Sequence, residues 1–342
     1  MTAQRGNVTI ADVARHAGVS PATVSRVMNG RFSGEPEVAE RVQASARTLA
    51  YAPSPLARSL ALGRTQVVAF VVPDLANPAF QSVLAGLSKT AAADGYRVLV
   101  ADSAESPDDE GPLSVEIRRR TDAIVLCAPR MPDEQLTALA GQLQPLVLIN
   151  RTSPTVPAPS LAIDYRAGIF ALAAHLHALG HRSLAYVYGP ERSMSNARRE
   201  QGLEDFLREH PDSRVVRIAA GAGSEDGRRA AAAVFDSGVS AALAFNDLVA
   251  VGLVGGLREL GVSVPEDISV TGFDDIPLAQ YVAPALTTAS VSHSELGVLA
   301  WRRMRALMSG EQPGHDVVFQ PRLEVRASSG PVRVAAAEAG AS

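Results

Sequence analysis

Four apolar stretches of this sequence end in polar side chains whose chemistry suits the recognition of a small hydroxylated molecule. The stretches "QVVAFVV", "PLVLI", "AALAF" and "ISVTGF" are followed by Asp74 with Asn77, Asn150 with Arg151, Asn246 with Asp247, and Asp274 with Asp275. Arg199 lies on a predicted helix after a fifth stretch, "SLAYVYG". Carboxylate, amide and guanidinium groups together accept hydrogen bonds from, and donate them to, vicinal hydroxyls. We interpret Asp164, Asp247 and Asp275 instead as helix caps or as groups that tie the strand ends.

The stretches that carry these side chains indicate an α/β scaffold. From Gln66 onward, apolar runs typical of buried parallel strands alternate with helical segments. Two successive series of this kind predict two lobes, each an open parallel sheet with helices on both faces. Ligands of such sheets bind at the carboxyl ends of the strands, which here means the cleft between the lobes. No GxGxxG or Walker-type loop follows a strand, so a nucleotide-dependent enzyme has little support.

Motifs for catalysis or metal binding are missing from the sequence. Cys127 is the one cysteine and lies in an apolar run, so neither an internal disulfide nor a CxxC metal pair can form. The seven histidines show no HExxH spacing, and no serine elbow is present. His175 and His177 stand two residues apart on a predicted helix and therefore point to different faces. We accordingly expect a protein that is not an enzyme and that needs no catalytic residue, cofactor or metal.

The N-terminal stretch "VTIADVARHAGVSPATVSRVMNG" predicts two short helices joined by a tight turn. Thr9 is placed to cap the first helix together with Asp12, and Gly18 ends it. Ser20 is placed to cap the second helix, which begins at Pro21. This pattern is typical of a helix-turn-helix. The alternative is a small helical hairpin that packs on the rest of the protein. The outward face of the second helix carries Pro21, Ala22, Ser25, Arg26 and Asn29.

Two further helical segments follow. The stretch "EPEVAERVQASARTLAY" predicts a third helix that completes a small core through Val38, Val42, Ala46 and Leu49. The stretch "APSPLARSLALGRT" predicts about two helical turns that end at Gly63. Because isolated helices need on the order of 12–15 residues to be stable in water, we expect this hinge helix to form only when something holds it.

Charge is unevenly distributed along the chain. Residues 1–64 carry eight arginines and four acidic residues, a formal charge of +4, so the remainder carries −8 within the total of −4. A basic head on an acidic body fits a local contact with a polyanion. No apolar stretch approaches the roughly 20 residues of a membrane span. The N-terminus also lacks the apolar segment of a signal peptide, and we therefore expect a cytoplasmic protein without membrane contact.

The stretches "TIADVARHAGVSPATVSRVMNG" and "YAPSPLARSLALGRT", with the α/β region, resemble the LacI family of bacterial transcription regulators over nearly the whole chain. In that family the second helix enters the major groove of DNA. The resemblance places the base-reading positions at Pro21, Ala22 and Arg26. Arg26 offers a fork suited to O6 and N7 of guanine, and Ala22 suits a thymine methyl group. The short polar side chains suited to phosphate oxygens are Thr9, Ser20, Thr23, Ser25 and Asn29.

The same resemblance gives the hinge helix a role, because in the family this helix folds in the minor groove. It implies that Leu60 is a wedge that unstacks the central base step and kinks the duplex, at a general cost of a few kcal/mol. Ser54, Ala57 and Arg58 belong to the same hinge helix. Pro55 stands where a non-proline residue is commoner in the family, and it favours helix initiation there.

In the α/β region, the loop "NPAF" is similar to the "NPFF" loop of the periplasmic ribose-type binding proteins, which are relatives of the family. This similarity implies that Asn77 and Phe80 lie at the ligand. Arg199, Asn246 and Asp274 match the effector arginine, amide and carboxylate of the family. Asn150 stands where a sugar-binding relative often has aspartate, and the match at Arg151 is intact. These seven residues form the expected effector-binding set.

Two departures from the family pattern affect the expectations. The third helix has Val38 and Ala39 where the family often carries a threonine and a basic residue, so we do not carry over one or two of the family's phosphate contacts. The stretch "DDEGPLSVEIRRR" contains Gly111 and Pro112, and we expect this pair to interrupt the helix usually found there.

We therefore predict a helix-turn-helix domain at 1–52, a hinge helix and linker at 53–65, a two-lobed core at 66–333 and a flexible tail at 334–342. Lobe 1 takes about 66–159 and 291–321, and lobe 2 about 160–290 and 322–333. As a homodimer, the protein would bind a pseudo-palindromic DNA operator and repress transcription, under control of a sugar or related polyol in the interlobe cleft. The alternative is a solute-binding protein of the ribose-binding type without a regulatory role. The DNA-binding head and the missing signal peptide disfavour it.

Overall fold

The computed structural model describes residues 8–51 and 63–333. By its internal contacts the chain divides into two units, residues 1–66 and 67–342. The predicted hinge helix, with Ser54, Ala57, Arg58 and Leu60, lies outside the described residues, as does the predicted tail.

The first unit is a bundle of three helices: α1 (Ile10–Ala17), α2 (Pro21–Met28) and α3 (Pro36–Thr48). Its local signals act as the sequence predicts. Thr9 and Asp12 form a reciprocal capping box, and Gly18 ends α1 in the left-handed conformation at φ +65°. The Ser20 hydroxyl accepts the Thr23 amide at 3.1 Å and caps α2. The buried core consists of Val13, Ala14, Ala17, Val24, Val27, Val42 and Ala46.

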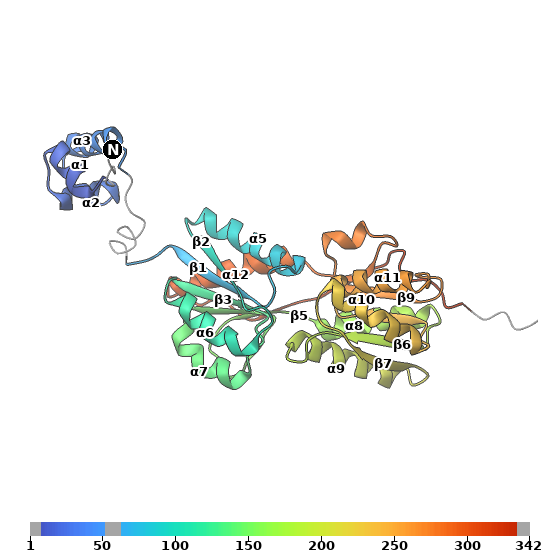
Figure 1. Ribbon diagram of the computed structural model, residues 1–342. Coiled ribbons are helices and arrows are strands. Elements are labelled where there is room, and N and C mark those ends of the chain that lie inside the picture. The colour runs from blue at the N-terminus through green and yellow to red at the C-terminus, as the bar shows by residue number, and fades with distance from the viewer. Residues whose placement is uncertain (1–7, 52–62, 334–342) are drawn as a thin grey trace, which may run out of the picture. The chain divides into compact units, whose positions relative to one another are not determined.

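The second unit begins with a six-stranded sheet that forms lobe 1 (Figure 1). Its strands, in spatial order, are β11 (Val317–Phe319), β5 (Ser160–Ile163), β4 (Leu146–Ile149), β3 (Ala123–Cys127), β1 (Val67–Val72) and β2 (Arg97–Asp102). All neighbouring pairs are parallel. One face is covered by α5 (Pro78–Ala93) and α12 (His293–Met308), the other by α6 (Pro107–Arg118) and α7 (Asp133–Leu143).

Lobe 2 repeats this plan around a second six-stranded sheet. Its strands, in spatial order, are β12 (Arg322–Glu324), β10 (Thr287–Ser290), β9 (Ser269–Asp274), β8 (Ala241–Ala244), β6 (Ser183–Tyr188) and β7 (Arg214–Ala219). Only β12 runs antiparallel within the sheet. One face carries α8 (Tyr165–Ala178) and α9 (Met194–Glu209), and the other α10 (Ser224–Asp236) and α11 (Asp247–Glu259). A 3-10 helix, Pro277–Gln280, follows β9. The predicted fold class, a helical head with an α/β two-lobed core, is confirmed.

The chain passes between the two sheets three times, after β5, after β10 and after β11. β5 pairs with β4, so the chain leaves the first sheet after Ile163 and not near residue 159. Hydrogen-bonded pairing with β4 on one side and with β11 on the other holds this strand in the first sheet. The parallel register brings the carboxyl ends of the strands of each sheet to one edge.

The expected break at Gly111 and Pro112 is wrong, because α6 continues through both residues. Pro112 is the sixth residue of α6, so it removes the amide that would donate to the Asp108 carbonyl, and tertiary contacts must offset this loss. The Glu110 carboxylate anchors the first turn by accepting the backbone amides of Arg130 and Met131, both at 2.7 Å. Gly111 permits close packing, since a Cβ atom there would lie 2.5 Å from the Gln135 amide nitrogen of α7. Among the described helices, none is long and apolar enough to cross a membrane.

Candidate functional site

The predicted base-reading residues lie together on the surface of α2. Pro21, Ala22 and Arg26 are all exposed, whereas Ser25 and Asn29 are half-buried. The Arg26 Nε donates to the Ala22 carbonyl at 3.4 Å, so the guanidinium lies back along its own helix. The resulting surface combines one exposed guanidinium with small neighbours, a combination that suits contact with base edges.

Three of the predicted phosphate-binding side chains have a structural task in the head. The Thr9 hydroxyl donates to the Asp12 carboxylate at 2.7 Å, and the Ser20 and Thr23 hydroxyls lie 2.9 Å apart. Each hydroxyl has one donor hydrogen and two acceptor lone pairs, so capping leaves further hydrogen-bonding capacity. Contact of these groups with phosphate remains a prediction.

In the core, a cavity lies where the strand ends of the two lobes face each other. Its volume is about 30 Å³. Compared with the volume that one buried water requires, this cavity has room for only a few water molecules. A sugar-sized ligand therefore requires the lobes to separate or the lining side chains to move. Five of the predicted effector-binding residues line this cavity: Asn77, Phe80, Arg199, Asn246 and Asp274.

Arg199 is the central cation of this cavity. It is 1% exposed, and its guanidinium carbon lies 4.3 Å from the ring centroid of Tyr165, 4.5 Å from that of Phe245 and 4.2 Å from that of Phe273. Nη1 donates to the Ser195 carbonyl at 3.1 Å, whereas Nε has no hydrogen-bond partner in the part of the chain that the structure describes. A buried donor without a partner is costly, and it is therefore available to a ligand.

Asp274 and His293 place two further groups at the same cavity. His293 Nε2 lies 3.5 Å from Asp274 Oδ1, and both side chains are more than nine-tenths buried. Neither His293 nitrogen has a hydrogen-bond partner among the described residues. Asp274 sits at the end of β9 with φ +105°, a backbone conformation that residues other than glycine rarely adopt. Together with Arg199, these residues offer donors and acceptors to one small space.

The two asparagines of the cavity also cap helices. Asn77 Oδ1 accepts the Ala79 amide at 2.9 Å at the start of α5. Asn246 Oδ1 accepts the Val249 amide at 2.8 Å, and its Nδ2 donates to the Ala222 carbonyl at 2.9 Å. Their amides are therefore fixed in orientation before any ligand binds.

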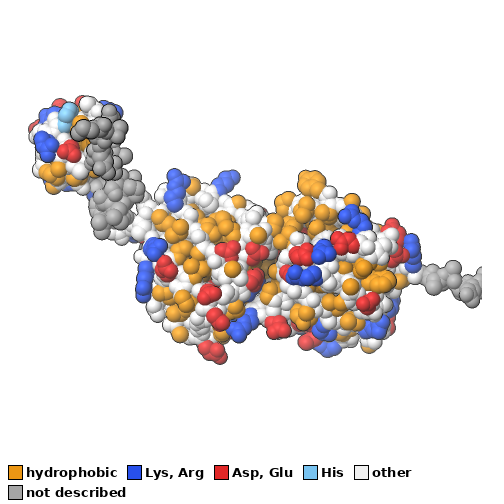
Figure 2. All heavy atoms as spheres, viewed as in Figure 1, with side chains coloured by type: hydrophobic (Ala, Val, Ile, Leu, Met, Phe, Trp, Pro, Cys, Tyr) orange, Lys and Arg blue, Asp and Glu red, His pale blue; other side chains and the backbone are white. Residues whose placement is uncertain are grey.

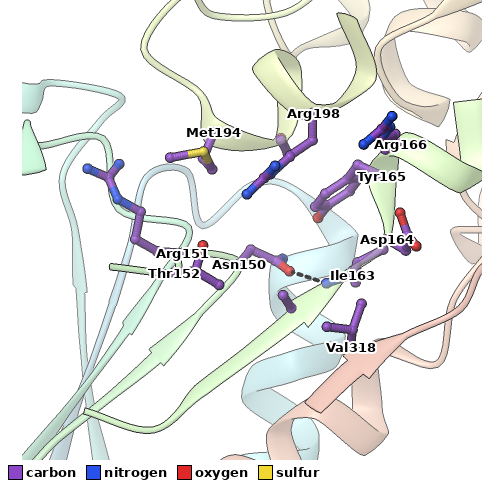
Figure 3. Close-up of a pocket in the computed structure, with 12 residues that line it drawn as sticks. Asn150, Arg151, Thr152, Ile163, Asp164, Tyr165, Arg166, Met194, Arg198 and Val318 are labelled. Atoms are coloured by element: carbon purple, nitrogen blue, oxygen red, sulfur yellow. Dashed lines mark hydrogen bonds between the residues drawn. The ribbon is translucent and has the colours of Figure 1, made fainter. Parts of the chain in front are cut away.

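Asn150 and Arg151 lie elsewhere, at a separate pocket of about 280 Å³ that shares Tyr165 and Ser195 with the cavity (Figure 3). Asn150 Oδ1 accepts the Ile163 amide at 3.2 Å and ties β4 to β5. Arg151 is occupied by lobe 1, because Nη2 lies 2.8 Å from Asp133 and 3.0 Å from the Met131 carbonyl. The structure therefore does not bring these two predicted residues to the cavity that holds the other five.

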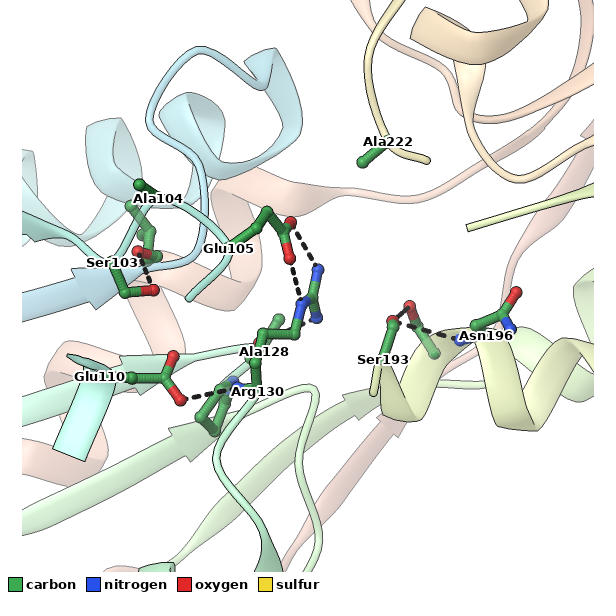
Figure 4. A network of polar contacts seen from close by, with 12 residues as sticks. Ser103, Ala104, Glu105, Glu110, Ala128, Arg130, Ser193, Asn196 and Ala222 are labelled. Carbon is green, nitrogen blue, oxygen red and sulfur yellow. Dashed lines mark hydrogen bonds and ion pairs between the residues drawn. The ribbon is translucent and has the colours of Figure 1, made fainter. Parts of the chain in front are cut away.

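Several lining residues were missed by the sequence reasoning. Arg130 donates twice to Glu105, at 2.6 and 2.9 Å, and this ion pair faces Ser193 and Asn196 across the cleft (Figure 4). Most of the missed residues follow a strand within three positions, the signal already used for the polar residues. These are Glu105, Ala128, Arg130, Tyr165, Ala222, Phe245 and His293. Ala79 and Ser195 line the cavity from helices, and Phe273 contacts Arg199 from within β9.

Asp247 lies behind Asp274 as a fully buried carboxylate. It accepts the Thr288 hydroxyl at 2.7 Å and the Ile276 amide at 2.8 Å. Burial, followed by the charge of Asp274, raises the pKa of Asp247 well above its usual value of 3.8. These contacts agree with its interpretation as a group that ties strand ends.

Acidic side chains also lie on the outer surface beside the groove between the lobes (Figure 2).

Comparison with known proteins agrees with both parts of the chain. Residues 9–54 match the model for bacterial regulatory proteins of the lacI family, and residues 173–329 match a periplasmic binding protein-like domain. The HTH-type transcriptional regulator DegA of Bacillus subtilis is 30% identical over 332 residues, which cover 95% of this chain and 98% of DegA. The HTH-type transcriptional regulator GalR of Escherichia coli is 33% identical over 327 residues, 94% of this chain and 95% of GalR.

Among solved structures, the lac repressor dimer bound to operator and the anti-inducer ONPF is similar over most of this chain. The sequence identity is 25%, the match covers 95% of this chain and 100% of that one, and the TM-score is 0.85. The same domain order and the same two-lobed core therefore occur in both proteins.

Proposed function

We infer the function from one premise: this chain belongs to the LacI family of bacterial regulatory proteins. It is a DNA-binding transcription regulator, as the curated relatives are. We propose that it acts as a repressor that binds a pseudo-palindromic operator as a homodimer and is controlled by a small molecule in the interlobe cleft. The observation that carries this proposal is the presence in one chain of an exposed α2 face and a buried polar cavity.

On the DNA side, Arg26 is the residue assigned to a guanine, and Pro21 and Ala22 lie against neighbouring base edges. This assignment is supported by the exposure of all three side chains on α2. Val24 and Val27 are buried on the opposite face and hold the helix in the head. Thr9, Ser20, Thr23, Ser25 and Asn29 would fix the register through phosphates. Leu60 of the predicted hinge helix would open the central base step, and a two-turn helix of this kind gains order from the bent duplex.

On the effector side, the ligand class is a sugar or related polyol. Arg199 Nε supplies a donor without a partner, Asp274 supplies an acceptor, and Phe80 offers an apolar surface for a C–H face. A hydroxylated ring satisfies all three groups at once, because each hydroxyl both donates and accepts. Asn77 and Asn246, fixed by their caps, add amide contacts at opposite sides of the cavity. We do not assign Asn150 and Arg151 to direct contact with the ligand, since their side chains are hydrogen-bonded to other residues of lobe 1.

Coupling between the two sites follows from the three chain crossings between the lobes. A ligand that needs a different separation of the lobes from the one seen here shifts their orientation, and the shift changes operator affinity. Typical coupling free energies of this kind are about 1–3 kcal/mol. The alternative, a solute-binding protein without a regulatory role, leaves the three-helix head without a task.

The remaining parts of the proposal follow from the DNA target. Operator DNA of a bacterium lies in the cytoplasm, which is therefore the proposed location. We also propose that the protein carries no enzymatic activity, because its relatives are regulators and the groups at the cavity are arranged for binding.

The test combines operator selection with ligand screening. Selection from genomic fragments by the purified protein identifies an operator, and fluorescence anisotropy measures affinity for it. Thermal-shift screening of sugars, polyols and nucleosides identifies ligands, which are then added to the operator assay. We expect a ligand that shifts both the melting temperature and the operator affinity. Failure of the protein to prefer any duplex overturns the proposal, and a ligand without effect on DNA affinity overturns its regulatory part.

A further inference from the structure

We propose that His177, His210 and Asp212 form a binding site for a divalent transition-metal ion such as Zn²⁺, on lobe 2 and away from the cavity. His177 lies in the last turn of α8, His210 directly follows α9, and Asp212 lies in the turn before β7. Each residue offers one ligand atom, and these atoms all lie within 4.8 Å of one another.

The donor set has the chemistry of a transition-metal site. Two imidazoles and one carboxylate are ligands that Zn²⁺ takes in three-residue sites, with water at the fourth position. Bond lengths of about 2.0–2.2 Å bring tetrahedral ligand atoms to roughly 3.4 Å from one another. His177 Nε2 already lies 3.2 Å from Asp212 Oδ1. All three residues are half-buried or exposed, and the proposal requires that rotation of their side chains closes the remaining distance.

His210 is free to ligate. Its ring centroid lies 4.1 Å from that of His177 and 4.8 Å from that of Phe206, and no hydrogen bond to its nitrogens occurs within residues 8–51 and 63–333. The two imidazoles therefore lie close together beside Phe206, with one nitrogen of each within 4.8 Å of the other. His210 would therefore bind a metal ion without first breaking a hydrogen bond of its ring nitrogens.

The groups around the site carry charges of both signs. His177 and His210 both lie at helix C-termini, where the last backbone carbonyls carry partial negative charge, and the His177 carbonyl accepts Arg182 Nη1 at 2.8 Å. Arg182 Nε lies 2.6 Å from Asp212 Oδ2 and fixes the orientation of the carboxylate, leaving Oδ1 toward His177. A second contact of this kind is how metal-ligating carboxylates are commonly oriented.

Spacing along one helix did not predict this site, because its three residues come from different elements. His175 and His177 point to different places, as expected, since His175 Nε2 lies 3.0 Å from the Ser329 hydroxyl. The partners of His177 come instead from the end of the next helix. A bound ion would join the C-terminal ends of α8 and α9, the two helices that carry Tyr165 and Arg199 at the cavity.

Metal binding by the full-length, tag-free protein tests the proposal. Co²⁺ is added as a spectroscopic probe for d–d absorption, and Zn²⁺ is titrated in competition with a chromophoric chelator. We expect one ion per chain, bound at least tenfold more weakly by His210→Ala and Asp212→Asn. The control His175→Ala retains the wild-type affinity. His210→Phe preserves the ring packing on Phe206 but removes both nitrogens, and it also loses the ion.

Circular dichroism of each variant shows whether it is folded. Wild-type affinity in His210→Phe and Asp212→Asn, with both variants folded, overturns the site. Absence of Co²⁺ absorption and of Zn²⁺ competition in the wild-type protein overturns it as well. Because none of these measurements involves DNA or effector, their outcome is independent of the proposed regulatory function.

Discussion

The guanidinium carbon of Arg199 lies 4.2 Å from the ring centroid of Phe273, so a cation from α9 is stacked on an aromatic ring of β9. Tyr165 and Phe245 add two further rings, at 4.3 and 4.5 Å. Each such contact contributes about 0.5–1 kcal/mol at an exposed site and about 2 kcal/mol or more when desolvated. The rings hold the guanidinium in place while its Nε remains without a partner, so the protein positions a strong donor for a ligand before the ligand arrives.

Arg199→Lys should separate effector binding from DNA binding. An ammonium group neither stacks as a planar fork nor donates from Nε. Hydrogen bonds to charged groups contribute about 1.5–3 kcal/mol, so we expect roughly a ten- to hundredfold loss of effector affinity. Operator affinity of the free protein should remain within about threefold. Isothermal titration with a ligand found by screening measures the first quantity, and anisotropy the second. An effector affinity equal to that of the wild type would contradict the assignment.

Arg26→Ala should relax sequence preference at one base pair of each half-site. A bidentate arginine–guanine contact contributes about 1–3 kcal/mol of discrimination, and its loss should make the four bases nearly equivalent at that position. Arg15→Ala is the matched control, because Arg15 is an exposed arginine on α1 that pairs with Asp12 at 3.0 Å. Its removal should weaken binding uniformly across sequences. Anisotropy with operators substituted at each position distinguishes the two patterns, and unchanged base preference in Arg26→Ala refutes the base-reading role.

Local signals in the sequence predicted the head well, because its helices are set by contacts a few residues apart. Thr9 with Asp12, Gly18 and Ser20 act at the positions that their types indicate. The strand-end rule likewise found Asn77, Asn246 and Asp274, since parallel strands bring their ends to one edge. These predictions required no knowledge of tertiary contacts.

The failures have a common origin in contacts distant in sequence. Pro112 was expected to break its helix, but Glu110 fixes the preceding turn to backbone amides 20 and 21 residues away. Arg151 was expected beside Arg199 and Asp274, but it pairs with Asp133 and lines the separate pocket. The aromatic rings around Arg199 are contributed by α8, β9 and the residue after β8, a combination that no single stretch of sequence displays.

Glu110→Ala should destabilise lobe 1 strongly. The substitution leaves the buried amides of Arg130 and Met131 without their acceptor. Each unsatisfied buried donor costs about 1–3 kcal/mol, so we expect a loss of roughly 2–5 kcal/mol in the free energy of unfolding. Glu110→Gln retains an acceptor oxygen and should lose less than half as much. Urea denaturation followed by circular dichroism gives both values. Equal losses in the two variants would show that packing at this position, and not the acceptor, stabilises the turn.

The free energy of unfolding of Asp247→Asn should increase relative to that of the wild type as pH rises. The pKa of the buried Asp247 carboxyl is raised well above 3.8, so between these two values the folded protein holds a proton that the unfolded chain has lost. In that window the contribution of Asp247 to stability is present at low pH and falls by about 1.4 kcal/mol per pH unit as pH rises through the folded pKa.

Asparagine does not titrate and fits the site, because its oxygen can accept the Ile276 amide while its nitrogen donates to the Thr288 hydroxyl. The difference in unfolding free energy between variant and wild type should therefore grow in favour of the variant from pH 4.5 to pH 7.5. Burial also raises the pKa of Glu110, but that residue is present in both proteins and cancels in the difference. Urea denaturation of both proteins at three pH values measures this difference in the free energy of unfolding. A difference that stays constant with pH means that Asp247 titrates alike in the folded and unfolded chains.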